Sequence, residues 1–211
     1  MAFGSIVRRC FGPWEHQISE LWRKMFVDLD EWTTSVRTMK PDAARILEVG
    51  CGEGAGTERL LEAFPEARID AIDITPRLGR LFRPQTDRVT FRQEFVEQRA
   101  EAEPGQYDLV VLCDVIHHVP PQAQESLLCA IKSLLRPGGV LAFKDWSRSR
   151  APIYYAALYA DRLLTGDDVQ YKTPEEARGQ LEAIFGPGRV LPSPPVRPWR
   201  SNYVFRVAAG A

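Results

Sequence analysis

The stretch ILEVGCGEGAGTERLL, residues 46–61, joins an aliphatic run to a loop with four glycines in seven positions. The run is typical of a buried strand, and the apolar spacing after the loop is typical of a helix. Glycine adopts backbone conformations closed to other residues, so a ligand can lie directly against the main chain of such a loop. The stretch therefore predicts a strand–loop–helix unit that binds a small molecule near the carboxylate of Glu48.

Short aliphatic runs alternate with helical segments through the middle of the chain. The predicted strands are residues 45–49, 68–74, 88–93, 107–113 and 140–145, and the predicted helices between them are 55–64, 77–83 and 121–135. Solidly apolar strands separated by helices imply a parallel sheet that is covered on both faces. A loop after the first strand of such a sheet lies at its carboxyl end, where doubly wound folds bind ligands.

Further helices are expected on both sides of this alternating region. Apolar residues at three- and four-residue spacings predict a helix over 14–39, and residues 151–164 form an aromatic-rich helical segment. Thr173 is a good N-cap, with a proline at the first helical position after it, and this third helix is expected to end near Gly186.

The last two apolar runs, 189–191 and 203–207, are expected to pair antiparallel at the edge of the sheet. We predict a single domain over 1–211. It divides into an amino-terminal helical lid (1–42), a cofactor-binding core (43–146) and a part with substrate-facing helices and the edge hairpin (147–211).

Composition narrows the class of protein. The chain has 211 residues and a net charge of −1, which disfavours a nucleic-acid-binding protein because phosphate binding needs a basic excess. No apolar run approaches a membrane span, and the start is too interrupted for a signal peptide. The four cysteines are widely spaced, which favours reduced thiols and a cytoplasmic location. The oligomeric state stays open.

The glycine loop satisfies a second pattern as well. Gly50, Gly52 and Ala55 match G-x-G-x-x-A, the fingerprint of a dinucleotide-binding loop. Asp73 ends the second predicted strand, where a carboxylate accepts hydrogen bonds from the ribose hydroxyls of any adenosine cofactor. Glu48 decides between the two patterns, because a buried acid ahead of the glycines suits a ligand with a cationic amino group better than a pyrophosphate.

Three motifs together resemble the class I S-adenosylmethionine-dependent methyltransferases, in particular small bacterial members. They are E-x-G-x-G-x-G from Glu48 with the acid of the second strand, YDLVVLCDVIHHV at 107–119 and LLRPGGVLAFKD at 134–145. The resemblance implies an α/β fold with a doubly wound, Rossmann-like seven-stranded sheet. Such a sheet is mostly parallel with an antiparallel last strand, and helices cover both faces. It also implies methyl transfer with S-adenosylmethionine as the cofactor.

The resemblance assigns one group of residues to the methionine end of that cofactor. Gly50, Cys51 and Gly52 would line the methionine part. Glu48 would hold the loop and lie near the amino group, and Cys113 would contribute backbone close by.

A second group would hold the adenosine. Asp73 would bind the ribose hydroxyls, and Ile74 would pack on the adenine. Many relatives carry an aspartate after the third strand that meets the adenine amino group, whereas this chain has RQEFVEQ there. Either Glu94 takes that role or Phe95 stacks near the ring, and the sequence leaves the two alternatives open.

Candidate catalytic residues follow the fourth and fifth strands. His118, or else His117, lies at the ligand end of the sheet and has the intrinsic pKa to take a proton near neutrality, although both could merely pack against the cofactor. Lys144 and Asp145 point to opposite faces, so one should face the pocket and the other should be a salt-bridged surface group. We name Asp145 as the third catalytic candidate. Histidines and acids do not cluster at ligand spacings, so no metal is expected.

Two further sets of side chains have a plain structural interpretation. Tyr154, Tyr155, Tyr159 and Tyr171 could form a substrate wall, but Tyr155 and Tyr159 are expected instead to pack an aromatic helix face on the sheet. Arg77, Arg80 and Arg83 are expected on a solvated helix face rather than in a site for RNA or anionic lipid.

The sequence thus favours methyl transfer to a small-molecule acceptor, in line with bacterial enzymes of lipid or aromatic secondary metabolism. The acceptor atom, whether oxygen, nitrogen or carbon, stays open. Two other classes are considered. An NAD(P)-dependent oxidoreductase would need a hydride-handling set such as a Tyr/Lys pair, and none is recognised in the sequence. A catalytically silent methyltransferase-like subunit would bind cofactor without turnover.

Overall fold

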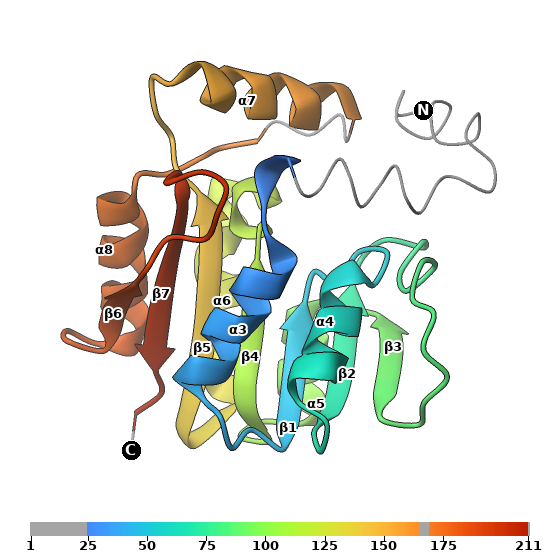
Figure 1. The fold of residues 1–211 in the computed structure, drawn as a ribbon. Helices are drawn as coiled ribbons and strands as arrows, with labels where there is room; N and C mark the ends of the chain where they lie inside the picture. Colours follow the sequence, from blue (N-terminus) through green and yellow to red (C-terminus); the bar gives the residue numbers. More distant parts are fainter. Residues whose placement is uncertain (1–24, 165–168, 211) are drawn as a thin grey trace.

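The computed structural model describes residues 25–164 and 169–210, and the structural statements that follow concern this part of the chain. A seven-stranded sheet with the order β3-β2-β1-β4-β5-β7-β6 runs through the molecule (Figure 1). The strands are β1 (Arg45–Val49), β2 (Arg68–Asp73), β3 (Val89–Gln93), β4 (Tyr107–Cys113), β5 (Leu135–Trp146), β6 (Val190–Ser193) and β7 (Asn202–Ala208). β7 runs antiparallel to both β5 and β6, whereas the other neighbours are parallel. The expected sheet, with its antiparallel last strand and edge hairpin, is confirmed.

Helices cover both faces of this sheet. They are α3 (Leu29–Met39), α4 (Ala55–Ala63), α5 (Val96–Ala102), α6 (Pro121–Leu134), α7 (Pro152–Leu164) and α8 (Pro174–Phe185), with a 3₁₀ turn η2 (Ile116–His118) after β4. α3 and α4 pack together on one face, and α5, α6 and α8 pack on the other (Figure 1). α7 lies across the carboxyl ends of the central strands, above the rest of the molecule in this view.

The central strands are buried on both sides, which explains their solidly apolar sequences. Ile46 and Leu109 belong to the core beneath α3 and α4, and Leu47 and Val110 belong to the core beneath α6 and α8. Because alternate side chains of a strand point to opposite faces, a strand covered on both faces needs apolar residues at consecutive positions.

The strand order places a switch point between β1 and β4. From β1 the chain continues outward to β2 and β3, and from β4 it continues in the opposite direction to β5. At such a point the loops after the two strands diverge and leave a crevice at the carboxyl ends. The glycine loop after β1 and the turn η2 after β4 border that crevice.

The predicted helix over residues 77–83 is wrong, because this stretch forms turns. Gly79 has a φ of +64°, and its N–H donates to the carbonyl of Gly52 at 2.9 Å. The N–H of Leu81 donates to the carbonyl of Glu53, also at 2.9 Å. A helix would need the N–H of Leu81 for residue 77, and the left-handed backbone of Gly79 interrupts helical geometry, so the stretch pairs with the glycine loop instead.

Two other expectations about helices are corrected. The helix expected over 14–39 breaks at residues 27–28, and α3 begins only at Leu29, where the Asp28 carboxylate accepts the N–H of Glu31 at 3.0 Å. The part of that prediction before residue 25 lies outside the described residues. Tyr155 and Tyr159 are exposed instead of packed on the sheet, because α7 crosses the strand ends and has one open side.

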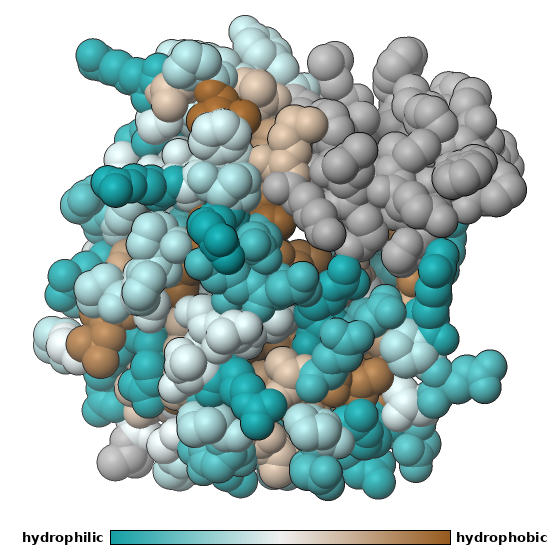
Figure 2. Space-filling model, viewed as in Figure 1, coloured by the Kyte–Doolittle hydropathy of each residue, from teal (hydrophilic) through white to brown (hydrophobic). Residues whose placement is uncertain are grey.

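Within the described residues no helix is long and apolar enough to cross a membrane. Figure 2 shows the face with α3 and α4 as mainly hydrophilic, with hydrophobic residues in scattered patches. Cys51, Cys113 and Cys129 are free thiols, whereas Cys10 lies outside the described residues.

Candidate active site

Two adjoining cavities open at the carboxyl ends of β1 and β4. The larger has a volume of about 620 Å³ and the smaller about 300 Å³. Gly50, Glu53, Asp114 and His118 line both, so these residues form the boundary between them. A ligand that fills both cavities would lie across the loop after β1 and the turn after β4.

The glycine loop takes its shape from backbone conformations that favour glycine. Gly50, Gly52 and Gly54 have φ values of +78°, +51° and +94°. A Cβ on Gly50 would collide with the side chain of Val115, so the two loops that border the crevice approach each other closely at this point. The predicted close contact between main chain and ligand is therefore available at Gly50 and Gly52.

Glu48 is buried in the wall of the smaller cavity, just below the loop. The hydroxyl of Thr57 on α4 donates to its Oε2 at 2.5 Å. Burial raises the pKa of Glu48 to about 7, and the nearby negative charge of Asp73 adds to that rise against the Thr57 hydrogen bond. Gly56 leaves room for the carboxylate, since a Cβ there would collide with it. Glu48 thus titrates near neutrality and can ionise to meet a cationic group.

Asp73 stands at the wall of the larger cavity, at the end of β2. Its Oδ2 accepts the N–H of Gly52 at 2.7 Å, and its Oδ1 accepts the N–H of Thr75 at 2.8 Å. A carboxylate has about four acceptor positions, so Asp73 can also accept from two hydroxyls of a ligand. The carboxylate therefore shapes the glycine loop and offers hydrogen-bond acceptors to the cavity.

Two apolar side chains line the larger cavity although much of their surface is exposed. Ile74 is 62% exposed and Phe95 is 58% exposed. Exposed apolar side chains in a cavity wall suit the faces of a planar ring. The larger cavity therefore matches an adenosine in two respects: hydroxyl acceptors at Asp73 and apolar surfaces beside them.

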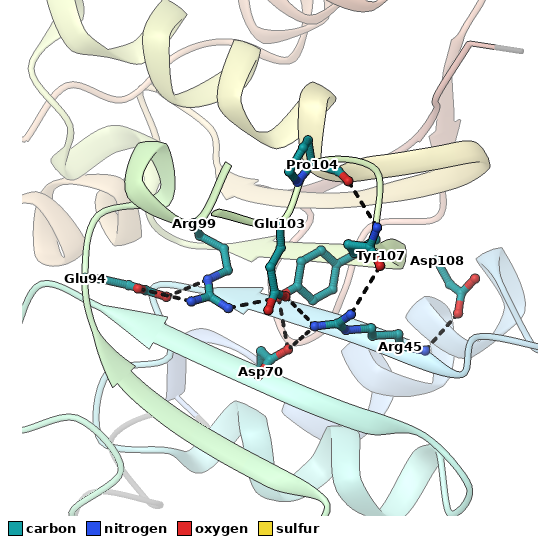
Figure 3. A network of polar contacts seen from close by, with 9 residues as sticks. Arg45, Asp70, Glu94, Arg99, Glu103, Pro104, Tyr107 and Asp108 are labelled. Carbon is teal, nitrogen blue, oxygen red and sulfur yellow. Dashed lines mark hydrogen bonds and ion pairs between the residues drawn. The ribbon is translucent and has the colours of Figure 1, made fainter. Parts of the chain in front are cut away.

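Glu94 also lines the larger cavity, so the structure brings both alternatives after β3 to the same wall. Arg99 of α5 holds its carboxylate, with Nε 2.8 Å from Oε1. Figure 3 shows Arg99 between Glu94 and Glu103, in a polar network that continues to Asp70 and Arg45. Arg99 also lies 3.4 Å from Glu103, and Glu103 is paired with Arg45 on β1. The guanidinium of Arg99 thus holds the carboxylate of Glu94 in place, and the sequence analysis did not predict its helix, α5.

Cys51 and Cys113 both line the smaller cavity. Burial raises the pKa of each thiol well above its ordinary value, and neighbouring carboxylates raise it further. Both groups are therefore neutral thiols near physiological pH and are not nucleophiles. Their position next to the glycine loop agrees with the predicted packing role.

His117 and Asp145 form a buried pair at the carboxyl end of the sheet. The two are paired through His117 Nδ1 and Asp145 Oδ1, which lie 2.5 Å apart, and the N–H of Trp146 donates to the same oxygen at 2.9 Å. Tyr171 stacks on the His117 ring with centroids 4.6 Å apart. A carboxylate that holds Nδ1 of a histidine directs Nε2 toward a reacting group, as in base–orienter pairs of many enzymes.

Both histidines line the smaller cavity, whereas Asp145 lies behind His117. The sequence ranked His118 first. The carboxylate contact falls on His117, so the geometry reverses that order. This pair could not be recognised from spacing along the chain, because Asp145 lies in β5 and comes beside η2 only when β5 pairs with β4 in the folded sheet.

The expectation that Lys144 or Asp145 would be a surface group is wrong. Their exposed fractions are 1% and 0%. Lys144 Nζ lies 2.5 Å from Oδ2 of Asp114, a residue that the sequence analysis missed and that has a positive φ of 55°. Burial lowers the pKa of Lys144, but Asp114, Cys113 and Asp145 together raise it above its ordinary value, so the ammonium stays charged. The signal for Asp114 was its place directly after β4, in the CDVIHHV motif.

Asp114, His117 and Asp145 bring one ligand atom each within 4.8 Å of one another, a geometry that could hold a metal ion. The premise that acids and histidines do not gather is therefore wrong for these three. The ammonium of Lys144 already neutralises Asp114, and His117 and Asp145 bind each other. A metal ion would have to displace these contacts.

Aromatic side chains form much of the smaller cavity. They are Phe26, Trp32, Trp146 and Tyr171. The rings of Phe26 and Trp146 meet edge to face, with centroids 6.0 Å apart. Tyr171 was considered from the sequence as part of a substrate wall, whereas Trp32 and Trp146 were not recognised. Walls of this kind fit a planar, largely apolar molecule.

Comparison with known proteins agrees with this geometry. The chain matches a family described as a methyltransferase domain over residues 47–141. Ubiquinone biosynthesis O-methyltransferase of Xanthomonas campestris pv. campestris is 35% identical over 136 residues, which are 61% of this chain and 55% of the relative. The chain thus spans about half the length of the curated relatives at the head of the comparison.

Two solved structures from Burkholderia thailandensis share the fold. An O-methyltransferase family protein has a TM-score of 0.73 at 16% identity, covering 99% of this chain and 61% of that chain. A 1,6-didemethyltoxoflavin-N1-methyltransferase, solved with 1,6-didemethyltoxoflavin and S-adenosylhomocysteine, has a TM-score of 0.66 at 19% identity, covering 99% and 89%. At these identities the likeness concerns the fold alone.

Proposed function

We propose that the chain is a class I S-adenosylmethionine-dependent methyltransferase that transfers the methyl group of this cofactor to a hydroxyl oxygen of a small molecule. The matched methyltransferase domain, the similarity to an O-methyltransferase and the shared fold support this proposal. The observation that carries the choice of oxygen is the buried His117–Asp145 pair in a cavity that adjoins the glycine loop. A hydroxyl needs a base to become a good nucleophile, and this pair supplies one.

The cofactor would lie across the two cavities. The larger would take the adenosine, with Asp73 accepting from the ribose hydroxyls and Ile74 and Phe95 beside the adenine. Glu94 would accept from the adenine amino group while Arg99 holds it. This assignment gives both residues after β3 a role, so the two alternatives from the sequence do not exclude each other.

The methionine end would lie at the boundary of the two cavities. Gly50, Cys51 and Gly52 would pack against it, and Cys113 would contribute backbone nearby. Ionised Glu48 would attract the amino group. S-Adenosylmethionine supplies a methyl group on a sulfonium sulfur, from which a nucleophile displaces a neutral thioether.

The protein's part in the reaction is to align the acceptor and to take its proton. His117 Nε2 would accept the hydroxyl proton as the oxygen–carbon bond forms. Asp145 would hold the ring through Nδ1 and stabilise the imidazolium that results. His118 lines both cavities and would contact the cofactor and the acceptor without acting as the base.

The aromatic walls favour a planar acceptor such as a phenol or an enol. In this proposal residues 1–42 act as a lid, since Phe26 and Trp32, which lie in the described part of that segment, line the acceptor cavity. The segment from 147 onward would contribute Tyr171 and Ala157 to the same cavity.

Calorimetry with S-adenosylmethionine, S-adenosylhomocysteine, NAD⁺ and NADP⁺ is the first test. We expect binding of the two sulfur compounds and no heat from the dinucleotides. The reverse pattern would support an oxidoreductase and reject the proposal. Transfer of a labelled methyl group to a panel of phenols then tests the reaction. Cofactor binding without transfer to any hydroxyl, amine or carbon acceptor would indicate a silent binding subunit.

A further inference from the structure

A short segment before α8, residues 169–172, is attached directly to the turn η2 that carries His117. The backbone N–H of Gln170 donates to the carbonyl of His117 at 2.9 Å. The ring of Tyr171 stacks on the His117 imidazole, with centroids 4.6 Å apart and an angle of 27° between the two planes. The segment therefore contacts both the backbone and the ring of the proposed base.

Gln124 of α6 fixes the backbone of the same turn. Its Nε2 donates to the carbonyls of Ile116 and Val119, which flank the two histidines, at 3.0 and 2.9 Å. Gln124 is buried, and its Oε1 accepts from the ammonium of Lys172. An amide whose donor and acceptor sides are both paired is held in one orientation. Through Gln124, Lys172 thus adds a third connection between the segment 169–172 and η2.

The contact to Asp145 does not by itself fix the plane of the His117 ring. A hydrogen bond tolerates a range of angles, and the torsion that turns a histidine ring about its Cβ–Cγ bond has broad minima. The imidazole could therefore tilt, and move Nε2, while Nδ1 stays paired with the carboxylate. An aromatic face packed against the imidazole removes this freedom, because the ring cannot tilt into it.

We propose that Tyr171 is a positioning residue that fixes the plane of the His117 imidazole and so directs Nε2 toward the acceptor hydroxyl. Asp145 holds one atom of the ring, and Tyr171 holds its face. The Tyr171 ring is itself held, because it is buried and Tyr154 meets it edge to face with centroids 5.7 Å apart. This inference rests on the proposed function, and it assigns the role to the aromatic ring of Tyr171.

The first test needs no methyl acceptor. Protein with ¹³C-labelled histidine, saturated with S-adenosylhomocysteine, is studied by NMR, and the His117 ring signal is identified by its loss in His117→Ala. A stacked aromatic ring shifts the protons that face it upfield. Tyr171→Leu should therefore move the His117 ring protons downfield, whereas Tyr171→Phe should leave them in place. Tyr159→Leu, the same change at an exposed tyrosine of α7, is the matched control and should leave the signal unchanged.

The second test compares two acceptors at one mildly alkaline pH: 4-methylphenol, which is neutral, and 4-nitrophenol, which is largely ionised. Only the neutral phenol needs a base. Tyr171→Leu should lower kcat for 4-methylphenol by about 10–100-fold, the effect of a misplaced reacting group, and kcat for 4-nitrophenol by less than about threefold. A side chain that served only as cavity wall would instead affect both phenols alike, mainly through KM. Tyr171→Phe should keep both rates.

The inference is overturned if Tyr171→Leu leaves the His117 signal in place, or if it slows the two phenols equally. Failure of the wild-type protein to methylate any phenol would reject the proposed function, and the NMR measurement would still decide whether Tyr171 sets the ring plane. If Tyr171→Leu does not fold, Tyr171→Met takes its place, because methionine is flexible enough to fill the space of the lost ring.

Discussion

Glu48 is a carboxyl group whose charge depends on pH near neutrality, because the fold has taken it out of water. The Thr57 hydroxyl donates to it, but burial outweighs that bond and raises its pKa to about 7. In solution a glutamate is fully ionised at this pH. In the protein, the ionised form is therefore available at little cost when a cationic group arrives.

We predict that affinity for S-adenosylhomocysteine rises roughly tenfold or more between pH 5.5 and 7.5, because binding of the ligand's ammonium group requires ionised Glu48. The sign follows from the raised pKa, since below pH 7 the free protein holds a proton that must leave on binding. Glu48→Gln, which keeps an oxygen for Thr57, should show weaker binding and little pH dependence. Calorimetry in buffers of different ionisation enthalpy would report the released proton.

The same raised pKa predicts how the free energy of unfolding of the ligand-free protein depends on pH. Ionisation of Glu48 is easier in the unfolded chain, so this group lowers the free energy of unfolding as pH rises from about 4.5 to 7, with no further change above. Glu48→Gln should lack this slope in urea denaturation. An affinity that is flat with pH in the wild-type protein would contradict the assigned place of Glu48.

We predict that His117 and His118 differ sharply in their effect on turnover. His117→Ala should lower the rate with a hydroxyl acceptor by roughly 10²–10⁴, the usual contribution of a general base. His118→Ala should lose less than about tenfold on the same scale. The rate of Asp145→Asn should lie between those of the two histidine variants, since asparagine keeps the contact to His117 but stabilises the imidazolium less.

Rates over pH 5.5 to 9 complete this test. A general base makes the wild-type rate depend on pH, and the rate of His117→Ala should lack that dependence. S-Adenosylhomocysteine affinity, measured in parallel, should hold in all three variants. Equal losses in the two histidine variants would mean that neither is a dedicated base and that alignment alone accounts for the rate.

At the scale of elements, the first turn of α4 is shaped around a side chain from the neighbouring strand. Gly56 lies where a Cβ would collide with the carboxylate of Glu48. Thr57, the next residue, donates to that carboxylate. The helix therefore both leaves space for Glu48 and holds it, and the apolar spacing that predicted the helix shows neither effect.

We predict that Gly56→Ala weakens binding of S-adenosylhomocysteine at least as much as Glu48→Gln, because the added methyl group displaces the carboxylate. The gain in helix propensity, about 1 kcal/mol for Gly to Ala, should not offset this loss. Gly179→Ala is the matched control. Gly179 lies on the exposed side of α8 with open space at its Cβ, so its replacement should stabilise the fold and leave binding unchanged.

Urea denaturation and calorimetry on the two variants check this prediction. If both alanine variants were stabilised alike with unchanged affinity, the place of Glu48 against α4 would not matter for the cofactor.

At the scale of the whole molecule, the end of the sheet away from the cavities carries the polar groups that join its layers. Asp108 at the start of β4 accepts the N–H groups of Ala44 and Arg45 at 2.9 and 2.8 Å, and it is paired with Arg136. Nearby, Tyr107 donates to Asp70 of β2 at 3.0 Å (Figure 3). These contacts connect segments that are far apart in the sequence.

We predict that Asp108→Ala lowers the free energy of unfolding by about 3 kcal/mol, because two part-buried backbone donors and Arg136 lose their acceptor. Asp108→Asn keeps an accepting oxygen and should lose less than half as much. Urea denaturation followed by circular dichroism measures both. Affinity for S-adenosylhomocysteine in the folded variants should be unchanged, since the site lies at the opposite end of the strands. A loss below about 0.5 kcal/mol, the level of an ordinary surface substitution, would contradict this role.

Local sequence patterns were enough to predict the strands of the sheet and the glycine loop. A strand buried on both faces must be apolar at consecutive positions, and a loop with left-handed backbone favours glycine, so β1, β4 and the loop at Gly50 could be recognised from neighbouring residues. The capped start of α8 at Thr173 is equally local, since its two hydrogen bonds join residues three apart. The residues assigned to the cofactor line the two cavities, because they lie in or directly after these locally recognisable strands and loops.

The sequence by itself thus determined the order of the strands, most of the helices and the residues around the glycine loop, because these depend on contacts between near neighbours. The tertiary structure alone decided the rest. Residues 77–83 form turns because their backbone pairs with a loop from another part of the chain, and Lys144 is buried because Asp114 compensates its charge. The contact of His117 with Asp145, on which the proposed role of His117 rests, likewise joins residues 28 apart that meet only when β4 and β5 pair. Such contacts are set by packing between distant segments, and spacing along the chain carries no record of them.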